Sequence, residues 1–181
     1  MANEYDARIA EALCDYLKNE EELKFTFDEE DGVVSFSKRL LCSKLNALRF
    51  EIRVHDDSYV VMGYCPINVT DSDKEAMANV GEYLNRANYG LACGCFDLDY
   101  RDGEVMFRVW VPSVDGSFRG EECHQALWTT MSMFTRYGDG LLAVMMGFAS
   151  PEKANDDAEK EDISERLRKF RSDMGLGSDE E

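Results

Sequence analysis

Residues 48–64 read LRFEIRVHDDSYVVMGY, and the fold of the chain follows from this stretch. Apolar side chains at positions 48, 50, 52 and 54 alternate with charged or polar side chains at 49, 51, 53 and 55. A period of two is typical of a strand that is buried on one face only. Asp56 and Asp57 then predict a turn, and residues 59–64 predict a return strand that Pro66 ends. The stretch therefore indicates two paired antiparallel strands.

On the N-terminal side of this pair, the sequence predicts one helix and one hairpin. Apolar side chains in residues 5–18 recur at helical spacing and form a single stripe, so we expect an amphipathic helix. Residues 23–27 then alternate as a strand, residues 28–32 end in an Asp-Gly turn signal, and Val34 and Phe36 lead the return strand. The first half of the chain therefore supplies two successive hairpins or a four-stranded meander.

On the C-terminal side, the sequence predicts a helix and then a second hairpin. Asp71 or Ser72 can cap this helix, and Gly90 stops it. Residues 91–100 and 104–111 alternate as two strands around an Asp-Gly turn.

A third helical stretch follows Gly120. We expect Gly138-Asp139-Gly140 to kink it or to join two helical pieces, because each glycine weakens a helix by about 1 kcal/mol relative to alanine. Residues 141–148 read LLAVMMGF and are apolar on all sides, which predicts burial on more than one side.

Strands that are grouped, rather than alternating singly with helices, predict an α+β fold with an antiparallel sheet and helices packed mainly on one face. The predicted order is α-β-β-β(-β)-α-β-β-α, within a single domain over residues 1–150. After Pro151 the sequence becomes rich in lysine, glutamate and aspartate. We therefore expect residues 151–181 to be an acidic tail, with a marginal helix at about 159–172 followed by a disordered end.

The charge of the chain restricts its partners. The formal net charge is −17, from 20 basic and 37 acidic side chains, whereas nucleic-acid binding depends chiefly on basic groups. We therefore expect no nucleic-acid partner. No apolar run approaches the roughly 20 residues that span a bilayer, so we expect no membrane segment. The first residues carry no export signal, and we expect a cytoplasmic protein.

Three phrases in the sequence resemble the YbjN family of bacterial proteins. They are YLNRANYG at 83–90, FDLDYRDGEVMFRVW at 96–110 and MFTRYGDG at 133–140, and the resembling features span roughly 70–149. The resemblance implies a fold similar to type III secretion chaperones and a role in sensory transduction or stress regulation. It implies no site residues, because the family carries no agreed active site.

The cysteines and histidines do not form a recognisable chemical site. Cys93-Gly94-Cys95 lacks the Cys-x-x-Cys spacing of strong zinc signatures, and no second pair accompanies it. Cys123 and His124 are neighbours on a predicted helix, where successive side chains point about 100° apart. His55 lies at a strand end beside a turn, a position that predicts an exposed side chain. We expect no metal, no cofactor, no disulfide and no catalytic residue, and therefore no enzyme.

These observations favour a non-enzymatic protein-interaction or chaperone-like regulatory module of a bacterial cytoplasm. It would bind a protein segment or a second copy of itself, as a homodimer, through an apolar sheet or helix surface. The predicted surface lies on the last helix, at Met131, Phe134, Leu141, Leu142, Met145, Met146 and Phe148. The alternative is a small-ligand sensor or enzyme with a pocket between the sheet and the last helix. That pocket would be lined by Trp110, Trp128, Tyr137 and the cysteines.

Overall fold

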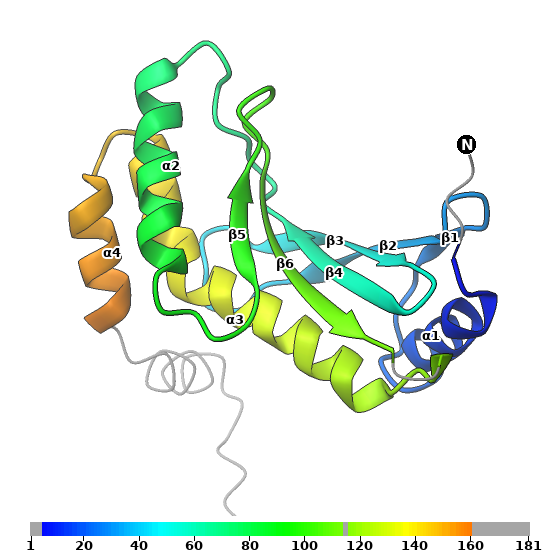
Figure 1. Cartoon of the computed structure of the whole chain (residues 1–181). Coiled ribbons are helices and arrows are strands. Elements are labelled where there is room, and N and C mark those ends of the chain that lie inside the picture. The colour runs from blue at the N-terminus through cyan, green and yellow to red at the C-terminus, as the bar shows by residue number, and fades with distance from the viewer. Residues whose placement is uncertain (1–4, 114–115, 161–181) are drawn as a thin grey trace, which may run out of the picture.

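A computed structural model of the chain describes residues 5–113 and 116–160. These residues form four α-helices and six strands (Figure 1). In chain order the elements are α1 (Ala7–Asn19), β1 (Thr26–Asp28), β2 (Val33–Arg39), β3 (Ala47–Val54), β4 (Ser58–Tyr64), α2 (Lys74–Asn88), β5 (Cys95–Leu98), β6 (Val105–Pro112), α3 (Gly120–Met145) and α4 (Pro151–Lys160). The predicted order of elements is confirmed, with four strands between the first two helices and one further helix at the end.

The six strands form one antiparallel sheet in the order β1-β2-β3-β4-β6-β5. The first four strands are neighbours in sequence and in space, so the predicted meander is confirmed. β6 pairs with β4, and β5 lies at the far edge, as the turn at Asp102-Gly103 requires. The α+β class with an antiparallel sheet is therefore confirmed.

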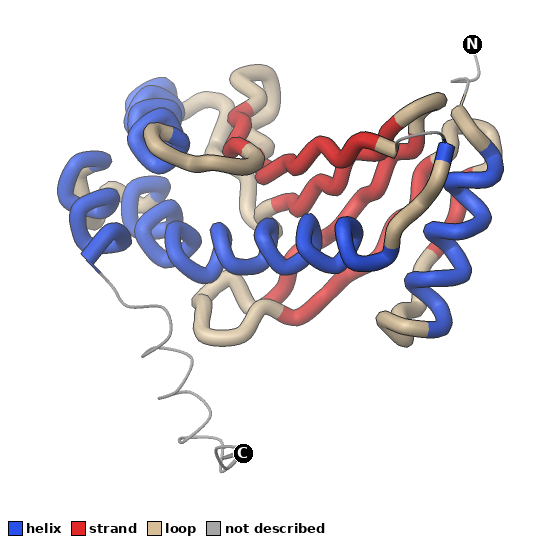
Figure 2. Tube along the Cα trace, turned by 60° about the horizontal axis from the view of Figure 1, so that its bottom comes forward, coloured by secondary structure: helices blue, strands red, loops and turns tan. Residues whose placement is uncertain are grey.

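One face of the sheet carries the core. The inward side chains Phe36, Phe50, Phe107 and Phe96 stand in one row across five strands, with Gly63 of β4 at its centre. Helix α3 crosses this face with α1 beside it (Figure 2). A Cβ atom at Gly63 would lie 2.4 Å from Cγ2 of Thr130 in α3. The glycine therefore leaves the gap into which the helix packs.

Helix α3 is continuous from Gly120 to Met145, so the expectation that Gly138-Asp139-Gly140 joins two separate helical pieces is wrong. The two glycines serve close packing instead. A Cβ at Gly138 would lie 2.7 Å from Cδ1 of Leu45, and one at Gly140 would lie 2.5 Å from the hydroxyl oxygen of Tyr83. Contacts on two sides of the helix thus offset the low helix propensity of glycine.

The structure also differs from the expected tail boundary at residue 150. Residues 151–160 form α4, which packs against α2 and α3 (Figure 1). Ala154 and Ala158 are buried in this contact, and the Tyr137 hydroxyl donates a hydrogen bond to Glu159. The small side chains of Ala154 and Ala158 let α4 approach α2 and α3 closely. The ten residues of α4, although rich in charge, therefore belong to the folded domain. Most of the predicted marginal helix at 159–172, and the disordered end after it, lie outside the described residues.

Helix α2 protects the edge of the sheet. Its N-cap is Asp73, whose carboxylate accepts a hydrogen bond from the Ala76 amide at 2.9 Å, rather than the predicted Asp71 or Ser72. At the other end, Asn88 pairs with the backbone of Phe96 in edge strand β5. The Asn88 Nδ2 donates to the Phe96 oxygen at 2.8 Å, and the Phe96 amide donates to Asn88 Oδ1 at 2.7 Å. This side chain closes the edge as a neighbouring strand would.

Replacing Asn88 by alanine removes both hydrogen bonds and leaves a partly buried backbone pair without a partner. We expect N88A to lower the free energy of unfolding by about 1–3 kcal/mol, as measured by urea denaturation. Asn85 is exposed on the same helix and provides the matched control, because N85A removes an amide that makes none of these contacts. Equal stabilities of the two variants would contradict this account of the edge.

Candidate interaction surface

The second face of the sheet is not covered by a helix within residues 5–113 and 116–160. Figures 1 and 2 show the described helices on one side of the sheet or beyond its β5 end. Strands β4 and β6 carry apolar side chains on this open face as well as on the core face. We call this group the apolar band; it consists of Val60, Met62, Tyr64, Met106 and Trp110.

The strand register brings the band together. Val60 lies opposite Trp110, and Tyr64 lies opposite Met106. The indole of Trp110 is 60% exposed, whereas Met62 and Tyr64 are buried beneath neighbouring side chains. A large aromatic group held on a rigid strand and left in water is typical of a protein-binding surface.

An ordered ion network borders the band on the β3 side. The guanidinium of Arg49 lies 3.9 Å from the centre of the Tyr64 ring and pairs with Glu51 and, at 3.0 Å, with Glu104. Burial, together with the nearby carboxylates, raises the pKa of Tyr64 to about 12. Arg108, on the β6 side, pairs with Asp97. These contacts fix the arginine side chains and so reduce the entropy that a partner's binding would cost.

The open face differs in charge from the chain as a whole. Its strand positions carry four arginines, Arg39, Arg49, Arg53 and Arg108, against three carboxylates, Asp28, Glu51 and Asp97. The whole chain has a net charge of −17. With Glu104, which pairs with Arg49, the count is four arginines against four carboxylates, so these positions are close to neutral on a strongly acidic protein.

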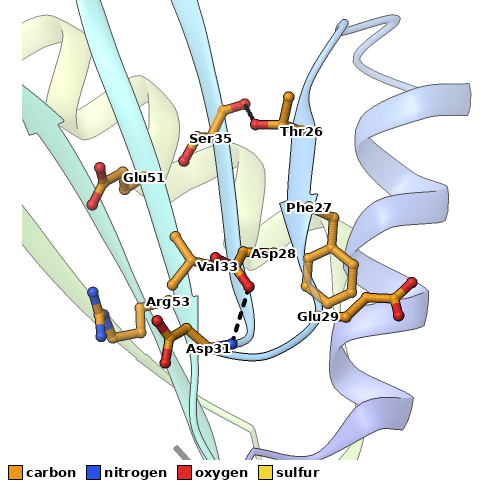
Figure 3. A pocket seen from close by; sticks show the side chains of 9 residues that line it. All are labelled: Thr26, Phe27, Asp28, Glu29, Asp31, Val33, Ser35, Glu51 and Arg53. Carbon is orange, nitrogen blue, oxygen red and sulfur yellow. Dashed lines mark hydrogen bonds between the residues drawn. The ribbon is translucent and has the colours of Figure 1, made fainter. Parts of the chain in front are cut away.

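A shallow hollow of about 620 Å³ lies over β1–β3 on the same face (Figure 3). Its carboxylates are partly engaged already, because Asp28 accepts hydrogen bonds from the backbone amides of Glu30 and Asp31, and Glu51 pairs with Arg49. No group of three or more side chains that could hold a metal ion occurs in the part of the chain that the structure describes.

The predicted surface on the last helix is largely core. Phe134, Leu141 and Leu142 are buried against the protein's own sheet and helices, so their assignment to an interaction surface is wrong. Met131 and Met145 are half-buried and pack against the core. Met146 and Phe148 alone of the seven are strongly exposed, at 58% and 81%, in the turn between α3 and α4. Within the apolar run 141–148, Leu141, Leu142 and Val144 are buried, so the predicted burial is confirmed for the helical part of the run and is wrong for its last three residues.

The expected alternative pocket does not form from its named residues. Trp110 lies on the open face, Trp128 is half-exposed on α3 over the opposite face, and Tyr137 is buried in the core. The two indoles are therefore separated by the sheet. Among the cysteines, Cys65 and Cys123 are buried, and burial raises the pKa of both thiols, to about 11 and about 12.

His124 belongs to a polar cluster that sequence reasoning missed. The carboxylate of Glu21, just after α1, lies 2.7 Å from Nδ1 of His124 and accepts hydrogen bonds from Lys38 at 2.9 Å and from Tyr16 at 3.1 Å. Burial alone would raise the pKa of Glu21, but these donors lower it to about 2. The cluster ties α1, β2 and α3 together, and its members are too far apart in sequence for spacing to reveal it. His55, predicted to be exposed, is half-buried.

Comparison with known proteins supports the fold. No protein-family model matches the sequence, and no curated protein matches it. Among solved structures, the chain is similar to YbjN from E. coli, which is described as a candidate transcription regulator. The TM-score is 0.54 at 12% sequence identity, and the match covers 80% of this chain and 96% of that chain. The expected resemblance in fold is therefore confirmed, and at this identity the match shows the fold alone.

No helix of the described residues has both the length and the apolar character that crossing a membrane requires.

The Glu21 cluster makes stability depend on pH in a defined direction. Because the pKa of Glu21 lies near 2 in the folded protein and near 4.5 in a free side chain, its contribution is complete above about pH 4.5. It is lost as the pH falls from there toward about 2. We expect E21Q to lower the free energy of unfolding at pH 7 by roughly 1–3 kcal/mol, because charged hydrogen bonds are lost.

The difference between E21Q and the original protein should shrink as the pH falls through this window, which urea denaturation at several pH values measures. Glu20 is exposed, and E20Q is the matched control. A difference that stays constant from pH 7 to pH 3 would contradict the assignment.

Proposed function

We propose that this protein is a non-enzymatic interaction module that binds protein through the open face of its sheet, and that the occupant of this face is a second copy of the chain. The observation that carries the proposal is the apolar band, in which Trp110 is 60% exposed and lies beside Val60 at one end. Tryptophan and arginine dominate the binding energy of many protein interfaces, and both occur here on rigid strands.

Charge favours a second copy as the occupant. Two molecules that each carry −17 repel one another over most approaches, and contact through the near-neutral open face avoids placing like charges against each other. In a two-fold arrangement the same face serves both partners, so Trp110 of one copy can lie against the apolar band of the other. Two sheets packed face to face in this way are separated by about 10 Å, the spacing that interdigitated side chains fill.

A regulatory role is compatible with this mode of action. The similar structure, YbjN, is described as a candidate transcription regulator. A protein with 37 acidic and 20 basic side chains is poorly suited to direct contact with DNA, so we propose that any regulation proceeds through protein contacts. We expect this activity in a bacterial cytoplasm.

The two tryptophans of the chain allow a direct test, because they lie on opposite sides of the sheet. In W128F the only indole is Trp110, and its emission should move to shorter wavelength as the protein concentration rises and the copies associate. In W110F the remaining Trp128 should show no such shift. Sedimentation velocity on the same samples measures the association itself.

A charged substitution gives the matched energetic test. We expect W110D to raise the dissociation constant of the dimer by roughly 30-fold or more, as truncating a central aromatic contact does. W128D, on the α3 side, should leave it unchanged. A monomer at all concentrations, or equal effects of the two substitutions, would refute the second copy as occupant of this face.

A further inference from the structure

The open face of the sheet has a projecting half and a hollow half. Trp110 projects from β6 and is 60% exposed. The hollow over β1–β3 has a volume of about 620 Å³ (Figure 3). Ligand sites of about 300–1,000 Å³ enclose most of a drug-sized molecule, so an indole is small enough to enter the hollow. In a two-fold dimer the same face serves both copies, and the projecting half of each copy can meet the hollow half of the other.

The strand register places the projection and the hollow on one row across the sheet. Val33 of β2 lies opposite Arg53 of β3, Arg53 lies opposite Val60 of β4, and Val60 lies opposite Trp110 of β6. A two-fold axis that runs parallel to the strands, between β3 and β4, reverses the order of this row without moving it along the strands. Trp110 of each copy then lies over Val33 of the other, within the hollow.

The side chains of the hollow suit an indole. Val33 is half-buried and offers an apolar floor, and Arg53 lies beside it on the next strand (Figure 3). Arg53 takes part in none of the ion pairs that the described residues form, so its guanidinium is available to stack on an aromatic ring, for which tryptophan is the best partner. Asp28 and Asp31 carry carboxylates that can accept a hydrogen bond from the indole N–H of Trp110.

The charges of the two halves are complementary. Four carboxylates and one guanidinium line the hollow, and Arg49 compensates only Glu51 among these carboxylates. Arg108 lies two residues from Trp110 on the same strand and face, and its side chain is 52% exposed although it pairs with Asp97. The same two-fold axis places Arg108 of one copy over Ser35 of the other, at the acidic hollow.

We propose that the indole of Trp110 of each copy enters the hollow over β1–β3 of the other copy. This inference rests on the proposed function and specifies which part of the partner's open face receives the indole. An axis between β4 and β6 would instead place Trp110 on Val60 of the apolar band. That arrangement sets the charged Arg108 against Met62 rather than against Ser35, and it leaves the hollow empty.

An aspartate in the floor of the hollow tests the contact. We expect V33D to raise the dissociation constant of the dimer on the order of tenfold, because it puts a further negative charge where the indole should pack. Gln125 is exposed on α3, on the opposite side of the sheet, and Q125D is the matched control because it adds the same charge there. Sedimentation velocity measures both constants, with W110A beside them. If W110A weakens the dimer and V33D does not, this inference is overturned and the proposed function stands; if W110A has no effect either, both fail.

A mixture of two variants separates a lost contact from a damaged fold. A V33D dimer lacks both intact hollows, and a W110A dimer lacks both indoles. In a mixed dimer the indole of the V33D copy meets the intact hollow of the W110A copy, so one of the two contacts is restored. We expect the mixed dimer to form with a dissociation constant roughly threefold or more below that of either variant alone. A mixture that associates no more tightly than its components would overturn the proposal.

Discussion

The close approach of Thr130 to Gly63 is the constraint on which the rest of the structure depends. Gly63 stands at the centre of a row of four phenylalanines that crosses the sheet, and it has no side chain. The gap in this row admits Cγ2 of Thr130, whose hydroxyl donates to the Ala126 oxygen within α3. The helix is thereby held at one place on the sheet, and Phe96 packs edge-on against Phe134 and Tyr137 beside it. The missing side chain thus lets α3 pack closely on the face that alternation along the strands makes apolar.

Because the described helices lie on this face or beyond the β5 end of the sheet, no described helix covers the other face. The apolar band around Trp110 is unusual for a solvated sheet face, where alternation normally places polar side chains. The same strands that bury Val61 and Phe107 inward present Val60 and Met106 outward. Ordered arginine pairs surround the band and bring this face near neutrality, which is the physical basis for its proposed contact with a second acidic copy.

The strands and their order along the chain could be predicted from the sequence because alternation in β3 and β6 is nearly perfect, whereas the pairing of β6 with β4 could not. The position of the interaction surface on the open face of the sheet could not be predicted. Residues 141–148 are apolar on all sides. The sequence does not show whether a partner protein or the chain's own α4 buries them. Gly138 and Gly140 read as helix breakers, because the close neighbours Leu45 and Tyr83 are remote in sequence. A signal for the open face is present in residues 59–64, which are apolar on both faces of the strand.

The double-mutant cycle between Gly63 and Thr130 tests the central constraint most directly, with urea denaturation as the measurement. Alanine replacing glycine in a strand without crowding stabilises a protein slightly, by about 0.4–1 kcal/mol. Because a Cβ at this position would lie 2.4 Å from Thr130 Cγ2, G63A should instead destabilise this protein by about 1–3 kcal/mol. In a T130S background, which keeps the hydroxyl and removes Cγ2, most of that penalty should disappear. A neutral or stabilising G63A, or the same penalty in both backgrounds, would contradict the account.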